Sequence, residues 1–248
     1  MKSSLSQPAL DVIHAYEALT FGENNVICPY FNNKRQKVRG ALRALIGKGS
    51  PEEIVEEATI IALRKHLDLR TTDANTITQF LVDNNLGIDC SGFVYHVLDA
   101  EINATKGTSL KKLISFPFAS SPIRKILTRL RPVENTNVKT FAHEKNSSLM
   151  SLSEITAGDF ITLIGSKKIG NPDHILLVAS VEEHVVTLVH SFKLPKDGKY
   201  NHGIKHCTVT ISDPTKSLIL QKWDDEEMLV AVQNAETVEV RRLVNKKI

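Results

Sequence analysis

The chain has 248 residues, of which 42% are hydrophobic and 24% are charged, and its formal net charge at pH 7 is +3. This composition is typical of a folded globular protein and excludes a disordered or fibrous chain. The small net charge also argues against a nucleic-acid-binding protein, because such proteins usually concentrate positive charge on one face. We therefore expect no nucleic-acid partner.

The sequence carries no sign of a membrane span or of export. No apolar run approaches the roughly 18 residues that cross a bilayer, and residues 1–19 lack the apolar centre of a secretory signal. Cys28, Cys90 and Cys207 are too few and too widely spaced for a disulfide framework or a Cys-x-x-Cys site. We therefore expect a reducing, cytoplasmic compartment by default, no membrane span and no cofactor. Export by another route stays open as an alternative.

The first third of the chain is predicted to be helical. An amphipathic helix is expected over 8–19, and Ser50-Pro51-Glu52-Glu53 is a helix start with a capping box. A further helix is expected from Asp73 to Val82, before the stop signal Asn84-Asn85. We expect residues 1–70 to form a helical extension packed on a core of residues 71–248.

One stretch between these helices is locally basic. Its apolar positions recur at helical spacing and end at Gly47, which predicts a short amphipathic helix. Two interpretations stay open: a solvated helix face, or a surface that recognises an anionic ligand such as a carboxylate-rich peptide. The basic residues are Lys34, Arg35, Lys37, Arg39, Arg43 and Lys48, and the apolar ones are Val38, Leu42, Leu45 and Ile46.

The most informative motif is Asp89-Cys90-Ser91-Gly92-Phe93. The apolar residues that follow recur at helical spacing, so Cys90 is expected in the first turn of a helix that Asp89 caps. The unpaired N–H groups and positive dipole end of that turn favour a thiolate, which is the nucleophilic form of cysteine. The alternative is a buried structural cysteine, which is how most free cysteines behave.

Strand patterns dominate the rest of the chain. An insertion at about 106–150, with short helical pieces near 110–114 and 123–130, separates them from the cysteine helix. Helices followed by antiparallel strands predict an α+β fold with a sheet of about five or six strands. The predicted strands are 160–164, 175–181, 185–190, 207–211, 218–223 and 238–243.

Two histidines lie on adjacent predicted strands. The apolar runs on either side of Glu182-Glu183-His184 predict a hairpin, and a turn centred on Glu182 places His174 directly opposite His190. Directly opposed residues have Cβ atoms roughly 5 Å apart, so one imidazole can orient the other by a hydrogen bond. The prediction depends on register, because a slip of one residue would move one ring to the other face.

These motifs resemble those of the NlpC-type cell-wall peptidases, which belong to the papain-like cysteine peptidases. Members carry an Asp-Cys-Ser-Gly-Phe-like segment at a helix start, as in Asp89 to Phe93, and a Gly-Asp entering the first strand, as in Gly158-Asp159. A histidine that opens a strand, here His174, and a polar residue one strand later, here His190, complete the pattern. The resemblance implies a papain-like (NlpC-type) core over roughly the C-terminal two-thirds, with the catalytic helix packed on the sheet.

The resemblance also implies roles for individual residues. Cys90 would be the nucleophile, His174 the general base, and His190 the group that orients His174. Asp89 and Ser91 would lie near the peptide of the substrate.

The family usually places a tyrosine just upstream of the cysteine, and residues 80–88 contain none. Tyr30, in Cys28-Pro29-Tyr30, is the substitute that we assign to substrate binding. The alternative for this segment is a surface loop whose aromatic side chains pack into the core.

The function implied is that of a cysteine peptidase or amidase that hydrolyses a peptide amide bond, with a murein-derived stem peptide as the substrate class. Two alternatives remain: a peptide-binding module without turnover on the same fold, and an acyl or peptide transferase. No metal site is predicted. Zinc held by His202, His206 and Cys207 is disfavoured, because adjacent residues such as His206 and Cys207 point to opposite faces of a strand.

Overall fold

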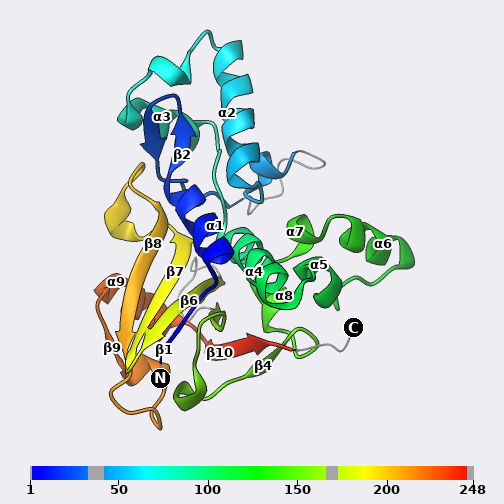
Figure 1. The fold of residues 1–248 in the computed structure, drawn as a ribbon, viewed down its shortest axis with the longest axis vertical. Helices are drawn as coiled ribbons and strands as arrows, with labels where there is room; N and C mark the ends of the chain where they lie inside the picture. The colour runs from blue at the N-terminus through cyan, green and yellow to red at the C-terminus, as the bar shows by residue number, and fades with distance from the viewer. Residues whose placement is uncertain (1, 33–41, 166–172, 245–248) are drawn as a thin grey trace.

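The computed structural model describes residues 2–32, 42–165 and 173–244. One antiparallel sheet forms its centre and helices pack against it, so the fold is α+β, as predicted (Figure 1). The sheet has eight strands in the described residues, so the prediction of five or six was too low. The neighbouring strands run in the order β4 (Ser147–Leu149), β10 (Thr237–Leu243), β5 (Phe160–Ile164), β6 (His174–Glu182), β7 (Val185–Phe192), β8 (Gly203–Thr210) and β9 (Lys222–Trp223).

Most of the helices precede the sheet in the chain. Within the three described ranges, no helix is both long and apolar enough to cross a membrane. The α-helices are α1 (Gln7–Glu17), α2 (Pro51–Arg64), α3 (Ala74–Asp83), α4 (Cys90–Lys106), α5 (Leu110–Leu113), α6 (Pro122–Leu130), α7 (Pro132–Asn135), α8 (Val138–Ala142) and α9 (Glu226–Asn234). Short 3-10 helices are η1 (Arg43–Ile46), η2 (Leu69–Thr71), η3 (Leu152–Glu154), η4 (Pro195–Asp197) and η5 (Leu218–Leu220).

The N-terminal segment contributes strands that its sequence pattern did not predict. β1 (Lys2–Ser4) pairs with the far end of β6, from Glu182 to Ser180, beyond the part of β6 that pairs with β5. A separate hairpin joins β2 (Leu19–Phe21) to β3 (Asn24–Val26). Residues 1–70 are therefore helical only in part and supply one strand to the main sheet, while a domain boundary near residue 70 stays a prediction.

The central strand β6 is buried on both faces. Ile175 and Leu177 belong to a core that the sheet shares with α1 and α4, whereas Leu176 and Val178 belong to a second core that includes residues of α9. This double burial explains why β6 reads as a continuous apolar run instead of an alternating one. A β-bulge between Val178 and Ser180 interrupts its pairing with β7.

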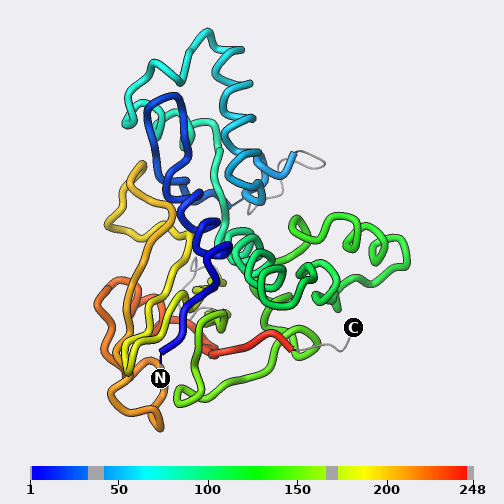
Figure 2. Tube along the Cα trace, in the orientation of Figure 1, coloured from blue at the N-terminus to red at the C-terminus, as the bar shows by residue number. Residues whose placement is uncertain are grey.

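Helix α4 lies between the sheet and helices α5, α6 and α7 (Figure 2). It packs against α1, β6 and β7. The approach at its first turn is close, since a Cβ on Gly92 would lie 2.9 Å from the carbonyl oxygen of Gly47. Gly107, with a φ of 61°, ends the helix in the left-handed conformation that glycine favours.

Several predicted elements differ from the structure. The strand expected over 218–223 is reduced to β9, after the 3-10 turn η5. Helix α9 follows it and was not predicted, although Asp225 caps it and Glu226 and Glu227 occupy its first turn. Of the helix expected before Gly47, residues 33–41 lie outside the described part of the chain, and the remainder forms η1.

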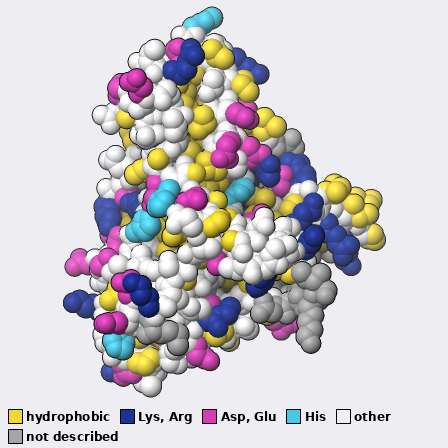
Figure 3. Space-filling view, in the orientation of Figure 1, with side chains coloured by type: hydrophobic (Ala, Val, Ile, Leu, Met, Phe, Trp, Pro, Cys, Tyr) yellow, Lys and Arg dark blue, Asp and Glu magenta, His cyan; other side chains and the backbone are white. Residues whose placement is uncertain are grey.

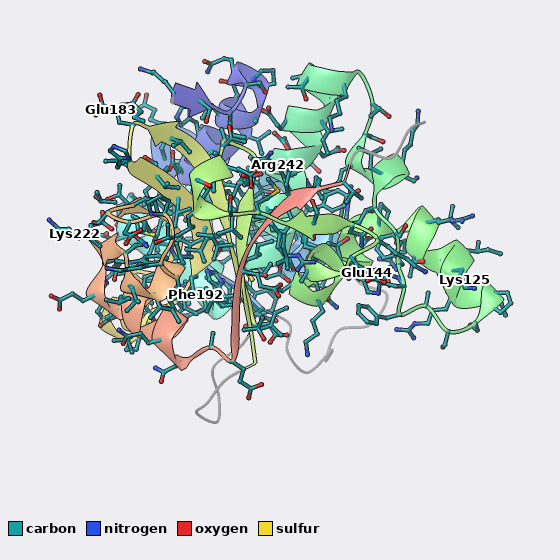
Figure 4. All side chains as sticks on the ribbon, turned by 90° about the horizontal axis from the view of Figure 1, so that it is seen from below. Lys125, Glu144, Glu183, Phe192, Lys222 and Arg242 are labelled. Atoms are coloured by element: carbon teal, nitrogen blue, oxygen red, sulfur yellow. The ribbon has the colours of Figure 1, made fainter. Side chains whose placement is uncertain are left out.

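An ion pair between a buried carboxylate and a partly exposed arginine joins the start of β5 to β10. Asp159, which is fully buried, accepts hydrogen bonds from Arg242 Nε at 2.6 Å and Nη2 at 2.8 Å (Arg242 is labelled in Figure 4). We expect Arg242→Gln to lower the free energy of unfolding by about 2–3 kcal/mol, because the carboxylate keeps its burial and loses its cation.

Urea unfolding followed by circular dichroism measures this loss. The matched control is Arg70→Gln, which removes an exposed pair with Asp68 and should leave the unfolding midpoint nearly unchanged. Equal effects of the two substitutions would contradict a stabilising role for the pair between Asp159 and Arg242.

Candidate active site

Cys90 occupies the first turn of α4, as predicted. Asp89 is the N-cap, and its Oδ1 accepts a hydrogen bond from the Gly92 N–H at 2.6 Å. The backbone N–H groups of Ser91 and of Ile175, the residue after His174, lie near enough to the Cys90 sulfur to oppose the rise in its pKa. The start of α4 and the start of β6 therefore meet at this sulfur, although 84 positions separate Cys90 from His174 in the sequence.

His174 and His190 form a hydrogen-bonded pair of buried rings. His174 Nε2 lies 2.9 Å from His190 Nδ1. The predicted register was wrong, because Leu177 pairs with Val189. If this pairing is continued to the end of the strand, His174 lies opposite Phe192 instead of His190. The rings of His174 and Phe192 have centroids 4.1 Å apart. The displacement is two residues, which keeps both histidines on one face, so the rings meet diagonally.

The hydrogen bond between the rings leaves His174 Nδ1 available. This atom is buried and has no hydrogen-bond partner in the described residues. If His174 carries its proton on Nε2 and donates it to His190 Nδ1, then Nδ1 keeps a lone pair at the end of β6 where the sulfur lies. In this tautomer His174 can accept a proton and His190 fixes its orientation.

Burial keeps all three groups neutral. Cys90 is 3% exposed and the two histidines are each 1% exposed. Burial raises the pKa of the Cys90 thiol to about 12, and Asp89 adds to this rise, while Lys48 opposes it. Burial also holds the pKa of His174 well below its usual value and lowers the pKa of His190 to about 3.

These shifts run against the prediction of a preformed thiolate. A helix N-terminus contributes only about 0.3–1 kcal/mol to an anion, whereas burial of a charged group can shift its pKa by roughly 3–5 units. Burial therefore favours a thiol beside neutral imidazoles at this site.

Tyr30 reaches this site from the N-terminal part of the chain. Its backbone bridges to Ile88, and its N–H donates a hydrogen bond to His202 Nδ1 at 3.1 Å. Its ring meets Phe192 edge to face at a centroid distance of 5.8 Å. Burial raises the pKa of Tyr30, and the proximity of Cys90 raises it further. Tyr30 and Phe192 thus line the site beside Cys90 and His174, and Phe192 was not identified from the sequence.

Lys48 is the other site residue that sequence reasoning missed. Its ammonium donates to Asp89 Oδ1 at 2.8 Å, to Ser91 Oγ at 2.7 Å and to the Thr136 carbonyl at 2.8 Å. Neither interpretation of the basic stretch holds for this residue, because Lys48 is buried. Arg43 of the same stretch pairs with Glu53, while Lys34, Arg35, Lys37 and Arg39 lie outside the described residues.

The Lys48 contacts also define what Asp89 and Ser91 do. Ser91 Oγ donates to Asp89 Oδ1 at 3.0 Å, and both side chains are buried. In the structure these two side chains hold the first turn of α4 in place. Their predicted contact with a substrate peptide stays a prediction.

The residues of the disfavoured zinc site have separate surroundings. His202 accepts the Tyr30 N–H, His206 pairs with Glu17, and Cys207 belongs to the second core. Within the described part of the chain, no three His, Cys, Asp or Glu side chains are grouped so that they could hold a metal ion.

Comparison with known proteins gives no relative for this chain: no protein-family model, curated protein or solved structure matches it. The resemblance to NlpC-type peptidases therefore depends on the motifs themselves. What the site does chemically has to be argued from its own geometry.

The contacts of Lys48 give a test of its supporting role. Lys48→Met should lower the free energy of unfolding by about 3–5 kcal/mol, because it leaves the Asp89 carboxylate buried without its cation. In the double variant Lys48→Met/Asp89→Asn no buried charge remains, and Asn can still cap α4. The double variant should therefore be more stable than Lys48→Met alone in urea unfolding. A double variant as unstable as the single one would contradict this assignment.

Proposed function

We propose that this protein is a cysteine peptidase or amidase on a papain-like, NlpC-type core, with Cys90 as nucleophile, His174 as base and His190 as the orienting residue. The observation that carries the proposal is the ring pair. His174 Nε2 is held by His190, and its buried Nδ1 is left without a partner in the described residues. A structural histidine pair would gain nothing from an unsatisfied buried nitrogen, whereas a general base needs one.

The neutral site supports a mechanism in which the proton moves during attack. The Cys90 sulfur forms a bond to the amide carbonyl carbon as the thiol proton passes to His174 Nδ1. Backbone N–H groups near Cys90, at the positive end of α4, stabilise the resulting oxyanion. His174 then gives its proton to the amine, the C–N bond breaks and a thioester remains.

The second half of the reaction regenerates the thiol. Water attacks the thioester while His174 Nδ1 accepts its proton. The C–S bond breaks, the acid is released and the proton returns to the sulfur. An amine in place of the water would give a transferase, so products formed with and without an added amine acceptor distinguish the two reactions.

The substrate class follows from the resemblance alone. We propose a short peptide as substrate, with a murein-derived stem peptide as the first one to assay. Tyr30 and Phe192 would contact it, because both side chains lie beside the reacting groups.

Substitutions in the ring pair and the thiol test the proposal. On a panel of murein fragments and ordinary peptides, Cys90→Ala and His174→Ala should abolish the turnover that wild type shows. His190→Ala should reduce kcat less, by about 10- to 100-fold, because an orienting group contributes less than the base that it supports. The products are measured by mass spectrometry.

Cys207→Ala is the matched control, since it removes another buried thiol from the second core and should leave turnover intact. Full activity of Cys90→Ala would refute the assignment of the nucleophile. A wild-type protein that binds these peptides and cleaves none would instead favour the binding module.

The pKa directions predict the pH profile of kcat/KM. His174 must be neutral to accept the thiol proton, and its lowered pKa keeps it neutral throughout the neutral range. Activity should therefore be lost only on the acid side, well below pH 6.5, as pH falls through that lowered pKa. The raised pKa of Cys90 moves any alkaline change above the usual thiol range, so we expect a plateau between about pH 7 and 9. A bell-shaped profile with an alkaline limb near pH 8 would instead indicate a preformed thiolate–imidazolium pair.

A further inference from the structure

Helix α6 presents its apolar side chains to solvent. Four of them follow the helical spacing i, i+3, i+4 and i+7, so they share one face. Their exposed fractions are 72% for Ile123, 59% for Ile126, 50% for Leu127 and 66% for Leu130. The one buried residue of the helix is Thr128, whose hydroxyl donates to the Lys125 carbonyl at 3.0 Å. This orientation is the reverse of that of an ordinary surface helix, which turns its apolar stripe toward the core.

The exposed stripe lies at the end of a projecting arm. Helices α5, α6 and α7 extend away from the sheet in Figure 1, and hydrophobic side chains gather over α6 in Figure 3. We call Ile123, Ile126, Leu127 and Leu130 together the arm face. A contiguous exposed apolar surface of this kind marks an interaction site.

The chain around the arm face is basic throughout. Between Glu101 and Glu134 it contains no Asp or Glu. All seven of its cationic side chains belong to exposed residues, and Figure 3 shows Lys and Arg beside the hydrophobic tip. The seven are Lys106, Lys111, Lys112, Arg124, Lys125, Arg129 and Arg131.

We propose that the arm face docks on an anionic lipid bilayer, with α6 lying in the plane of the headgroups. A helix with one apolar face and cationic side chains on the rest of its surface is the form that binds such an interface, with its apolar side chains entering roughly 5–10 Å. The long side chains of Arg124, Lys125 and Arg129 can reach lipid phosphates while the apolar stripe enters the acyl boundary. The interaction is peripheral, because the nine residues of α6 extend only about 13 Å.

The charge pattern favours lipid over a second copy of the chain. Two arm faces packed together would bring Arg124, Lys125 and Arg129 of one helix α6 against those of the other, and α6 contains no carboxylate to neutralise them. Arg131, just after α6, pairs with Glu134. The surface area that the nine residues of α6 could bury is also small compared with the roughly 800 Å² that each partner buries in a stable complex.

The docked surface is separate from the candidate active site. Lys125 lies at the outer end of the arm and Phe192 lies away from it, near the sheet (Figure 4). Docking through α6 therefore does not require the peptidase proposal to hold, and catalysis does not require docking.

Vesicle flotation of the full chain tests the proposal. The probes are vesicles of 30% phosphatidylserine in phosphatidylcholine and vesicles of phosphatidylcholine alone. Wild type should float with the anionic vesicles, and its binding should weaken on the order of five-fold for each cation removed by substitution. Raising the salt concentration should also release the protein from the vesicles, since salt screens exposed charges.

The variant Ile123→Gln/Ile126→Gln/Leu130→Gln tests the apolar contribution. It should reduce vesicle binding by at least about 100-fold, since each of these side chains contributes about 10-fold or more to the affinity when buried.

A matched variant controls for the loss of apolar surface in general. Leu63→Gln/Leu149→Gln/Leu220→Gln removes three leucines of similar exposure outside the arm and should float as wild type does. Circular dichroism establishes that both triple variants are folded.

Three results would overturn the proposal. These are no flotation of wild type with anionic vesicles, equal flotation of the arm variant and wild type, and equal binding to both kinds of vesicle at low salt. A wild-type dimer in analytical ultracentrifugation that the arm variant dissociates, without vesicle binding, would assign the arm face to a second copy.

Discussion

The ammonium group of Lys48 joins three segments that are far apart in the sequence. It contacts the Asp89 carboxylate and the Ser91 hydroxyl at the start of α4, and the carbonyl of Thr136 after α7. A buried ammonium needs acceptors for all its protons, and these three supply them. The position of the first turn of α4, and hence of Cys90, depends on this buried network. The ion pair is also a constraint on chemistry, since the carboxylate raises the pKa of the neighbouring thiol and the ammonium lowers it.

Burial decides the protonation of the candidate site. The helix N-terminus and Lys48 both favour a thiolate, yet the thiol and both imidazoles lie almost entirely out of water. Desolvation penalises every charged form, so it favours the thiol and the neutral imidazoles. In the reaction that we propose, charge would therefore develop only in the transition state. Fixed N–H groups would then act on the oxyanion where water does not compete, which is where such groups contribute most.

The arm and the site differ in how the chain uses apolar residues. At the site, Phe192 packs against His174 and both are buried. On α6, the stripe that would normally enter a core faces water, and a threonine faces inward. No local propensity distinguishes these cases, because an amphipathic helix has the same sequence pattern whichever way it turns. Whether the apolar face of such a helix turns toward the core or toward solvent depends on how the neighbouring helices and strands pack against it.

The sequence by itself determined the features that depend on neighbours in the chain. These include the α+β order of elements, the capping box at Ser50, the place of Cys90 in a first helical turn, and the shared face of His174 and His190. Caps, turns and strand periodicity act over a few residues, so a pattern can predict them. Only the tertiary structure decided the diagonal register of the two histidines, the contact of Lys48 with Asp89, the approach of Tyr30 and the neutral state of the thiol. Each of these depends on burial or on pairing between distant segments, and desolvation has no counterpart in the order of residues.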